Sequence, residues 1–141
     1  MINSVLLNNK TVGDSQSGYL TFFEAMKDVP FEVKRVYYVH GVPKGITRGK
    51  HAHKKLEQLL WCPYGKIEVV LDNGSERQSF VLDDPAKALL VSKGYWHEMI
   101  WRQENSVLCV AASDYYDEDD YIRDYDVFLD YVSKGVWNFE G

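Results

Sequence analysis

The sequence predicts an all-β domain, a sandwich or small barrel, that ends in a helix. Between residues 33 and 113, short runs rich in β-branched and aromatic residues recur at intervals of about ten residues, separated by turns. This spacing is typical of β-sandwiches and small barrels. After Ser113 the pattern changes to aromatic residues at helical spacing. The 141 residues are enough for one domain with its own core, and we expect a single domain over 1–141.

Nine segments have the composition of strands, because valine, isoleucine and aromatic residues are frequent in them. Glycine, proline, asparagine or aspartate marks most of the turns between them, and Asn73-Gly74 is the strongest hairpin signal in the chain. A helical turn is expected over 24–28, where Pro30 ends it. The segments are 5–12, 19–23, 33–39, 59–63, 66–71, 78–82, 88–92, 96–101 and 107–112.

The strand expected over 33–39 should divide its side chains between two faces. Successive strand residues point in opposite directions, so Arg35 and Tyr37 should share one face. Val36 and Tyr38 should lie on the other. This places a cation beside a phenol on one side of the strand.

The last part of the chain predicts a helical segment over about 118–133. An acidic run, Asp117 to Asp120, precedes it, and negative charge stabilises a helix N-terminus. We expect the aromatic face of this segment to pack on the β-domain, with the core of the domain over about 33–113. The residues at helical spacing are Tyr121, Tyr125, Phe128 and Val132.

The charge distribution favours a small anionic ligand. A net charge of −5 argues against a nucleic-acid-binding protein, because such proteins usually carry a basic surface. Four basic residues nevertheless surround residues 51–53, and a local positive patch on an acidic protein suits a small anion. A solvated lysine-rich turn is the alternative. The basic residues are Arg48, Lys50, Lys54 and Lys55.

The two cysteines and the N-terminal residues point to a reducing compartment. Cys62 and Cys109 each lie in an apolar run, where a free thiol behaves as a small hydrophobic group, and we expect both to be reduced. The N-terminal residues lack the charged start and long apolar stretch of a signal peptide. No run reaches the ~18 apolar residues of a membrane span. We therefore expect a cytoplasmic protein.

The motif with the clearest chemistry is His51-Ala52-His53. In an extended segment the two imidazoles point to the same face, because Ala52 takes the other. Histidine titrates near neutral pH and is also a common metal ligand. The pair therefore suits either proton transfer or metal binding.

The spacing around these histidines resembles the first motif of the cupin superfamily. Gly45, His51-x-His53 and Gly65 stand where that motif has its glycines and its His-x-His pair. Gly94 to His97 resembles part of the second motif, although Ser92 replaces its proline and Trp101 its asparagine. The resemblance implies a cupin-type small β-barrel, or jelly roll.

Metal cupins imply a ligand set of three histidines and one acid. Here the histidines would be His51, His53 and His97, with Gln58 or Glu57 in the acid position. A neutral glutamine is a poorer ligand for a hard cation than a carboxylate, which weakens the metal interpretation. A purely structural role would require three buried, satisfied imidazoles in one small barrel.

A closer resemblance covers residues 33–128. The chain resembles the sugar 3,4-ketoisomerases, metal-free homodimeric cupins that act on thymidine-diphosphate-4-keto-6-deoxyglucose in the synthesis of 3-amino-3,6-dideoxyhexoses for surface polysaccharides. One difference is in the turn Asp14-Ser15-Gln16-Ser17-Gly18, which is longer than expected and lacks an arginine. The matching stretches are Arg35-Val36-Tyr37-Tyr38, Arg48-Gly49-Lys50-His51-Ala52-His53-Lys54, Leu56-Glu57-Gln58, Gly94-Tyr95-Trp96-His97-Glu98-Met99, Ala112-Ser113-Asp114-Tyr115-Tyr116-Asp117-Glu118 and Asp120-Tyr121-Ile122-Arg123.

The resemblance implies that His51 is the catalytic base. Moving a ketone from C4 to C3 requires a base at C3, an acid at C4 and a partner for the oxyanion. His53 could orient the base or hydrogen-bond a sugar hydroxyl. Tyr37 could donate a proton or bind the oxyanion, and His97 could carry the proton to C4 or polarise the carbonyl. We expect the product to be the 3-keto-6-deoxy-galacto sugar and no cofactor to be needed.

The diphosphate and the sugar require further contacts. Arginine forms planar bidentate pairs with phosphate, which makes Arg48 the first candidate and Arg35 the second. Lys54 and Gln58 complete the expected substrate-binding set. Both arginines could instead pair with acidic residues of the chain.

Two other functions fit the same residues. A nucleotide-sugar epimerase of the related cupin type also removes a proton beside a ketone, but at C5. A non-catalytic cupin that binds an anion would not need two titrating histidines.

Overall fold

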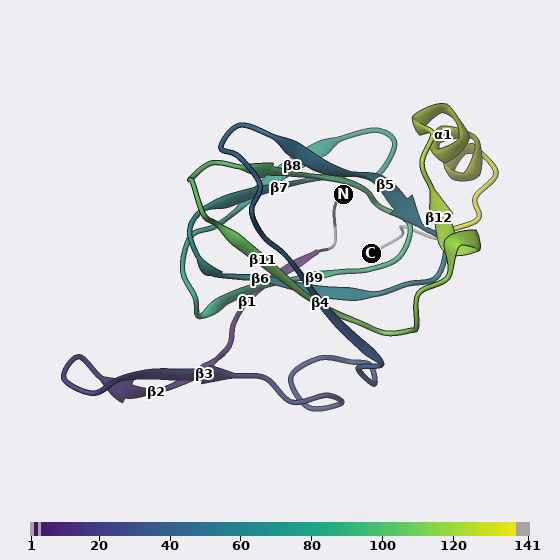
Figure 1. The fold of residues 1–141 in the computed structure, drawn as a ribbon. Helices are drawn as coiled ribbons and strands as arrows, with labels where there is room; N and C mark the ends of the chain where they lie inside the picture. Colours follow the sequence, from purple (N-terminus) through teal and green to yellow (C-terminus); the bar gives the residue numbers. More distant parts are fainter. Residues whose placement is uncertain (1, 3, 138–141) are drawn as a thin grey trace.

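The computed structural model describes residue 2 and residues 4–137. They form two five-stranded sheets, which face each other across a common core, and a separate two-stranded hairpin (Figure 1). In order across the first sheet, the strands are β1 (Val5–Asn8), β9 (Lys87–Val91), β6 (Gln58–Tyr64), β11 (Val107–Ala112) and β4 (Arg35–Val39). The second sheet contains β12 (Tyr121–Ile122), β5 (Thr47–His53), β10 (Trp96–Trp101), β7 (Ile67–Asp72) and β8 (Arg77–Leu82). The predicted all-β class and C-terminal helix are confirmed.

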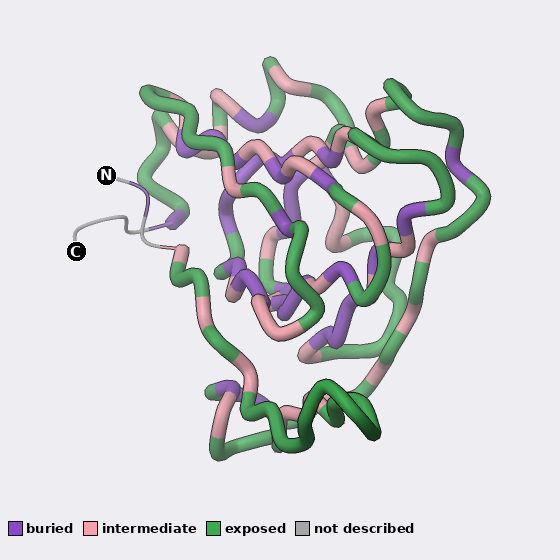
Figure 2. The backbone as a smooth tube through the Cα atoms, turned by 90° about the vertical axis from the view of Figure 1, so that its left-hand side faces the viewer, coloured by how far each residue is buried: buried purple, intermediate pink, exposed green. Residues whose placement is uncertain are grey.

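The core lies between the sheets, as the alternation of each strand requires. Strand β7 buries Ile67, Val69 and Leu71 completely, while the residues between them remain partly exposed. Trp101 and Val110 contribute to the same cluster from β10 and β11. Figure 2 shows the buried residues mostly in the inner part of the molecule and the exposed ones mostly on its outer loops. This packed interior gives strands β4 and β5 fixed positions.

The N-terminal part differs from the single strand expected over 5–12. Strand β1 ends at Asn8, and the backbone N–H of Asn9 then bonds to the carbonyl of Ala86. The chain leaves the sheet there and forms the hairpin of β2 (Lys10–Asp14) and β3 (Gly18–Phe22), which projects from the barrel (Figure 1). The segment had to be divided because its first half pairs with β9 and its second half with β3.

The C-terminal part corrects the predicted boundary of the helix. The helical segment was expected to begin at about residue 118, but residues Glu118–Asp120 form one 3₁₀ turn, η1, and β12 follows. Tyr121 pairs with His53, and this strand pairing overrides the helical spacing. The helix α1 (Tyr125–Ser133) begins after Asp124, whose carboxylate caps it by accepting from the backbone N–H groups of Asp126 and Val127.

Helix α1 packs on the outer face of the second sheet. Phe128 is completely buried there, in a cluster with Ala52, Trp96 and Ile122. Ala52 is the residue between the two histidines, so the helix covers the back of the strand whose front carries them. The expectation that aromatic residues dock this helix is confirmed for Phe128 and Tyr125.

Two smaller expectations can also be compared with the structure. Cys62 and Cys109 are both free thiols, as predicted. No helix among the described residues is long and apolar enough to cross a membrane. The cytoplasmic location stays a prediction.

The packing of α1 leads to a test of stability. Replacing Phe128 with alanine should lower the free energy of unfolding by about 3–5 kcal/mol, because it removes a fully buried aromatic ring. Val127→Ala is the matched control in the same helix, since Val127 is 46% exposed, and it should cost less than about 1 kcal/mol. Urea denaturation followed by circular dichroism measures both. Equal losses in the two variants would contradict the packing described here.

Candidate active site

A cavity of about 380 Å³ opens between strand β4 of the first sheet and strand β5 of the second. Strand β4 supplies one wall and strand β5 the opposite wall. Its base is apolar, with Met99, Trp101 and Leu108. The remaining lining residues are Arg35, Tyr37, Val39, Arg48, Gly49, Lys50, His51, Tyr116, Tyr121 and Arg123.

A β-bulge in β5 determines which side chains reach this cavity. His97 of β10 pairs with His51, but Met99 pairs with Arg48, so β5 has one extra residue between these pairs. Paired residues share a face, and the bulge therefore brings Arg48 to the same side as His51 although the two are three positions apart. Gly49 lies in the bulge with φ of 71°, and a Cβ atom there would stand 2.4 Å from Cε of Met99.

Three imidazoles meet behind the cavity wall. The ring centroid of His51 is 5.0 Å from that of His53 and 4.5 Å from that of His97. His51 lines the cavity, whereas His53 and His97 are only 3% exposed. Tyr121 covers both members of the His-x-His pair, with its ring 4.9 Å from His51 and 4.5 Å from His53. The strand alternation expected for the pair is present.

Burial keeps these histidines uncharged. It lowers the pKa of His51 to about 3, with the neighbouring His53 and Arg123 acting in the same direction. Burial also lowers the pKa of His53 to about 4 and that of His97 well below its usual value. His51 is therefore a free base at neutral pH, with its lone pair available to a substrate.

Tyr37 lies on the facing strand β4 and lines the same cavity as His51. Its Oη accepts a hydrogen bond of 2.8 Å from Nε2 of Gln58, which leaves the phenolic hydrogen free. Burial raises the pKa of Tyr37 to about 12, so the hydroxyl stays protonated at neutral pH. Gln58, expected to contact the substrate, is buried and acts on Tyr37 instead.

The cavity is rich in cations, although the whole protein is acidic. Arg35, Arg48, Lys50 and Arg123 all line it. The guanidinium carbon of Arg35 lies 5.1 Å from the ring centre of Tyr37, and its buried Nε has no hydrogen-bond partner among the described residues. A buried N–H donor without a partner is costly, and an anionic ligand would satisfy it.

Lys54 does not join this group. Its ammonium lies 5.8 Å from the ring centre of Tyr131, on the side of helix α1. Strand alternation explains the difference, because Lys54 follows His53 and so leaves the face that the histidines occupy.

Among the polar residues after Ser113, sequence reasoning missed four that belong to the site. Tyr116, Tyr121 and Arg123 line the cavity, and the carboxylate of Asp120 lies 3.0 Å from Nδ1 of His53. Arg123 forms a bidentate pair with Glu118 and lies over the ring of Tyr121 at 4.3 Å. The acidic residues 117–120 are a signal in this region, but by themselves they predict the start of the helical segment expected over about 118–133.

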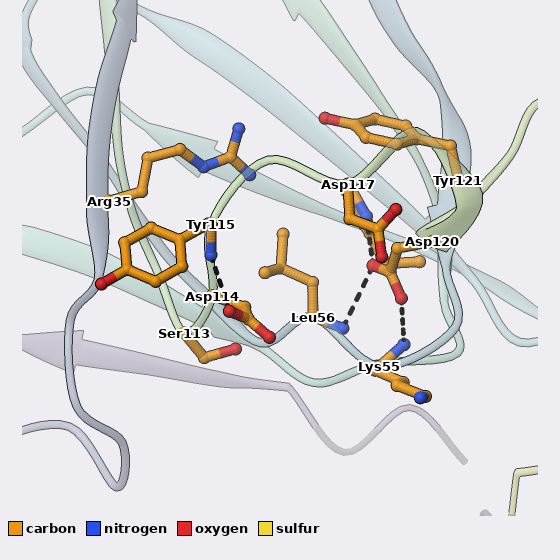
Figure 3. Close-up of a pocket in the computed structure, with 10 residues that line it drawn as sticks. Arg35, Lys55, Leu56, Ser113, Asp114, Tyr115, Asp117, Asp120 and Tyr121 are labelled. Carbon is orange, nitrogen blue, oxygen red and sulfur yellow. Dashed lines mark hydrogen bonds and ion pairs between the residues drawn. The ribbon is translucent and has the colours of Figure 1, made fainter.

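A smaller cavity of about 130 Å³ adjoins the first one. The two share Arg35 and Tyr121, and the smaller one continues past His53 to Asp120 and Leu56 (Figure 3). Burial raises the pKa of Asp120, while the N–H groups of Lys55 and Leu56 act in the opposite direction. The carboxylate of Asp120 thus contacts both the imidazole of His53 and the backbone N–H groups of Lys55 and Leu56, which follow β5.

The histidines meet only part of the requirement of a metal cupin. One nitrogen from each of His51, His53 and His97 lies within 4.8 Å of the others, and the described residues add no carboxylate to this group. Gln58 is bonded to Tyr37, and His53 already has a partner at Nδ1. The four-ligand set of three histidines and an acid is therefore incomplete.

Comparisons with known proteins agree on one family. The model of the FdtA family, described as WxcM-like, C-terminal, matches residues 3–133. A curated relative from Aneurinibacillus thermoaerophilus, TDP-4-oxo-6-deoxy-alpha-D-glucose-3,4-oxoisomerase, is 47% identical over 92% of each chain.

Two solved structures of the QdtA 3,4-ketoisomerase from Thermoanaerobacterium thermosaccharolyticum are also similar. A double mutant in complex with TDP is 44% identical, with a TM-score of 0.90 over 95% of this chain and 96% of that one. A single mutant in complex with TDP-4-keto-6-deoxyglucose is 41% identical, with a TM-score of 0.91 over 100% of this chain and 99% of that one.

The buried histidines lead to a pH prediction. In the folded protein, the NMR signals of His51, His53 and His97 should keep their neutral positions from pH 8 to well below 6. In urea all histidines should titrate near pH 6.5. The unfolded state then takes up protons first as the pH falls, so the free energy of unfolding should fall below pH 6.5 by up to about 1.4 kcal/mol per unit for each histidine. Titration of these three rings near 6.5 in the folded protein would contradict the prediction.

Proposed function

Because the chain belongs to the FdtA family of WxcM-like proteins, we propose that it moves the keto group of TDP-4-keto-6-deoxyglucose from C4 to C3. The observation that carries the proposal is a neutral His51 facing a protonated Tyr37 across a cavity lined with cations. One substrate in this cavity would therefore meet a general base, a hydrogen-bond donor and a site for its anionic diphosphate. The 3-keto product would accept an amino group at C3, which suits the synthesis of 3-amino-3,6-dideoxy sugars.

His51 removes the proton at C3. The C4 carbonyl acidifies this proton, and its loss leaves an enediolate whose charge needs a hydrogen-bond donor. Tyr37 can be that donor, because Gln58 occupies the acceptor side of its oxygen. The base and the donor come from opposite sheets, so a sugar between them contacts both.

The return of a proton to C4 sets the stereochemistry. In the gluco sugar the C3 hydrogen points to one face of the ring, and a hydrogen added to C4 from that same face gives the galacto product. His51 and His97 lie side by side in the wall of β5 and β10, with ring centroids 4.5 Å apart. If the C3 proton is removed and the C4 proton is delivered on the face of the sugar that lies against these histidines, the product is TDP-3-keto-6-deoxy-galactose.

The diphosphate binds the cations at the rim of the cavity. Arg35, Arg48 and Arg123 all line the cavity and offer it three guanidinium groups. Arg123 is paired with Glu118 in the free protein, and a diphosphate offers it a stronger bidentate partner. The reaction uses only these side chains, without a metal or another cofactor.

The decisive experiment follows the reaction by proton NMR in deuterated buffer. Chelator-treated protein with TDP-4-keto-6-deoxyglucose should lose the C3 proton signal and form a 3-keto sugar. A parallel reaction in ordinary water keeps a proton at C4, and its coupling to the C5 proton identifies the galacto product. Exchange at C5 alone would indicate an epimerase, and binding without exchange would indicate a non-catalytic cupin. Activity that depends on added metal would contradict the proposed mechanism.

Substitution of the base tests the site. His51→Asn should lower kcat by about 10²–10⁴-fold, because it removes the general base, while the fold is kept. His40→Asn is the control, since His40 is exposed and lies outside the cavity. Near-normal turnover in the His51 variant would place the base elsewhere.

We also propose that the protein is a homodimer whose N-terminal hairpins pack on the partner. The hairpin pairs Val12 with Leu20, both more than half exposed, and this apolar face extends from the barrel without covering it (Figure 1). At its tip, Asp14 closes the turn by accepting from the N–H groups of Gln16 and Ser17. This turn is remote from its own cavity, so any substrate contact it makes is with the site of the second copy.

The dimer is tested with two charges on opposite faces of the hairpin. Leu20→Asp should shift the protein from dimer to monomer, because it places a carboxylate in the apolar face. Thr21→Asp is the matched control on the other face, where Thr21 bonds to Thr11. Sedimentation velocity measures the masses against 16.3 kDa for one chain. A wild-type monomer at micromolar concentration would contradict the proposal.

A further inference from the structure

We propose that Asp120 is a positioning residue of the reaction and acts through His53; this inference rests on the proposed function. The carboxylate of Asp120 lies 3.0 Å from Nδ1 of His53. Asp120 is the last residue of the 3₁₀ turn η1, which precedes β12 and helix α1, and it lies 67 residues after the histidine that it contacts.

The carboxylate is itself held in place. Oδ1 accepts a hydrogen bond from the N–H of Lys55 at 2.8 Å, and Oδ2 accepts one from the N–H of Leu56 at 3.3 Å (Figure 3). Oδ2 is also the atom that contacts His53. The backbone carbonyl of Asp120 also accepts the N–H of Lys54 at 2.9 Å. The side chain of Asp120 is only 13% exposed. Both oxygens are thus engaged as acceptors.

An acceptor at Nδ1 determines where the proton of the imidazole lies. Neutral histidine carries one N–H, and Asp120 requires it at Nδ1, which leaves the lone pair on Nε2. This Nε2 is buried and has no hydrogen-bond partner among the described residues. A buried acceptor that is left unsatisfied lowers stability, so the fold maintains this one at a cost.

The free lone pair of His53 can stabilise His51 after His51 has taken up a proton. A ring nitrogen of His53 lies within 4.8 Å of one of His51. When His51 takes the C3 proton it becomes a cation, and a neighbouring lone pair stabilises it, whereas a neighbouring N–H would repel it. Asp120 therefore favours the charged intermediate by selecting the tautomer of His53.

Asp120→Asn changes the tautomer with little change in shape. The amide oxygen can still accept a backbone N–H, but the amide nitrogen donates to Nδ1 and so moves the proton of His53 to Nε2. We expect kcat to fall about 10–100-fold and KM to change less than about twofold, because the loss arises after the substrate has bound.

Asp117→Asn is the matched control. It removes the same charge from the same segment, and asparagine can still accept the N–H of Asp119 as Asp117 does. The control should therefore keep wild-type kcat and KM. Equal losses in both variants would assign the effect to charge or to the fold of the segment, and would overturn the proposal.

The second readout needs no substrate. Nitrogen-15 NMR of labelled histidine reports the tautomer directly, and His53 should carry its proton at Nδ1 in the wild type and at Nε2 in Asp120→Asn. A wild-type proton at Nε2, or an altered tautomer with unchanged kcat, would overturn the proposal. If Asp120→Asn does not fold, the wild-type spectrum alone decides whether Asp120 sets the tautomer. If the wild type shows no isomerase activity, the proposed function fails separately.

Discussion

The antiparallel pairing of β5 with β10 is the constraint on which the site depends. It places His51 opposite His97, and its bulge brings Arg48 to the face of the histidines. The facing sheet supplies Arg35 and Tyr37 from β4. Because both sheets are fixed by a buried core, these groups already line one cavity before any ligand binds. Preorganisation of this kind removes part of the cost of orienting a substrate.

The same arrangement leaves several buried polar atoms without a hydrogen-bond partner among the described residues. They include two nitrogens of His97, one of His53 and Nε of Arg35. A stable barrel can tolerate such groups because each costs only a small part of its packing energy. They are concentrated around the cavity, which is where a ligand with hydroxyl and phosphate oxygens can satisfy them.

Sequence reasoning identified the class of fold and the strands of the barrel because their alternation and turns are local signals. Alternation also predicted that His51 and His53 share one face, and their rings do lie together, whereas their catalytic roles stay a prediction. It did not identify Asp120, Tyr121 and Arg123, because their positions depend on a strand pairing between residues about 70 apart. The role of Gln58 was also missed, since only the structure shows that it bonds to Tyr37. Lys54 illustrates the reverse error, in which a basic residue near a motif faces away from it.

The bulge at Gly49 bears on the transfer of this chemistry to other barrels. A His-x-His pair can be grafted onto any extended strand, since the alternation alone aligns its two rings. The guanidinium of Arg48 cannot be moved with it in the same way, because a regular strand would turn that residue to the outside. A designed scaffold therefore needs the extra residue and its glycine, and an alignment that closes this one-residue insertion would assign the arginine to the wrong face.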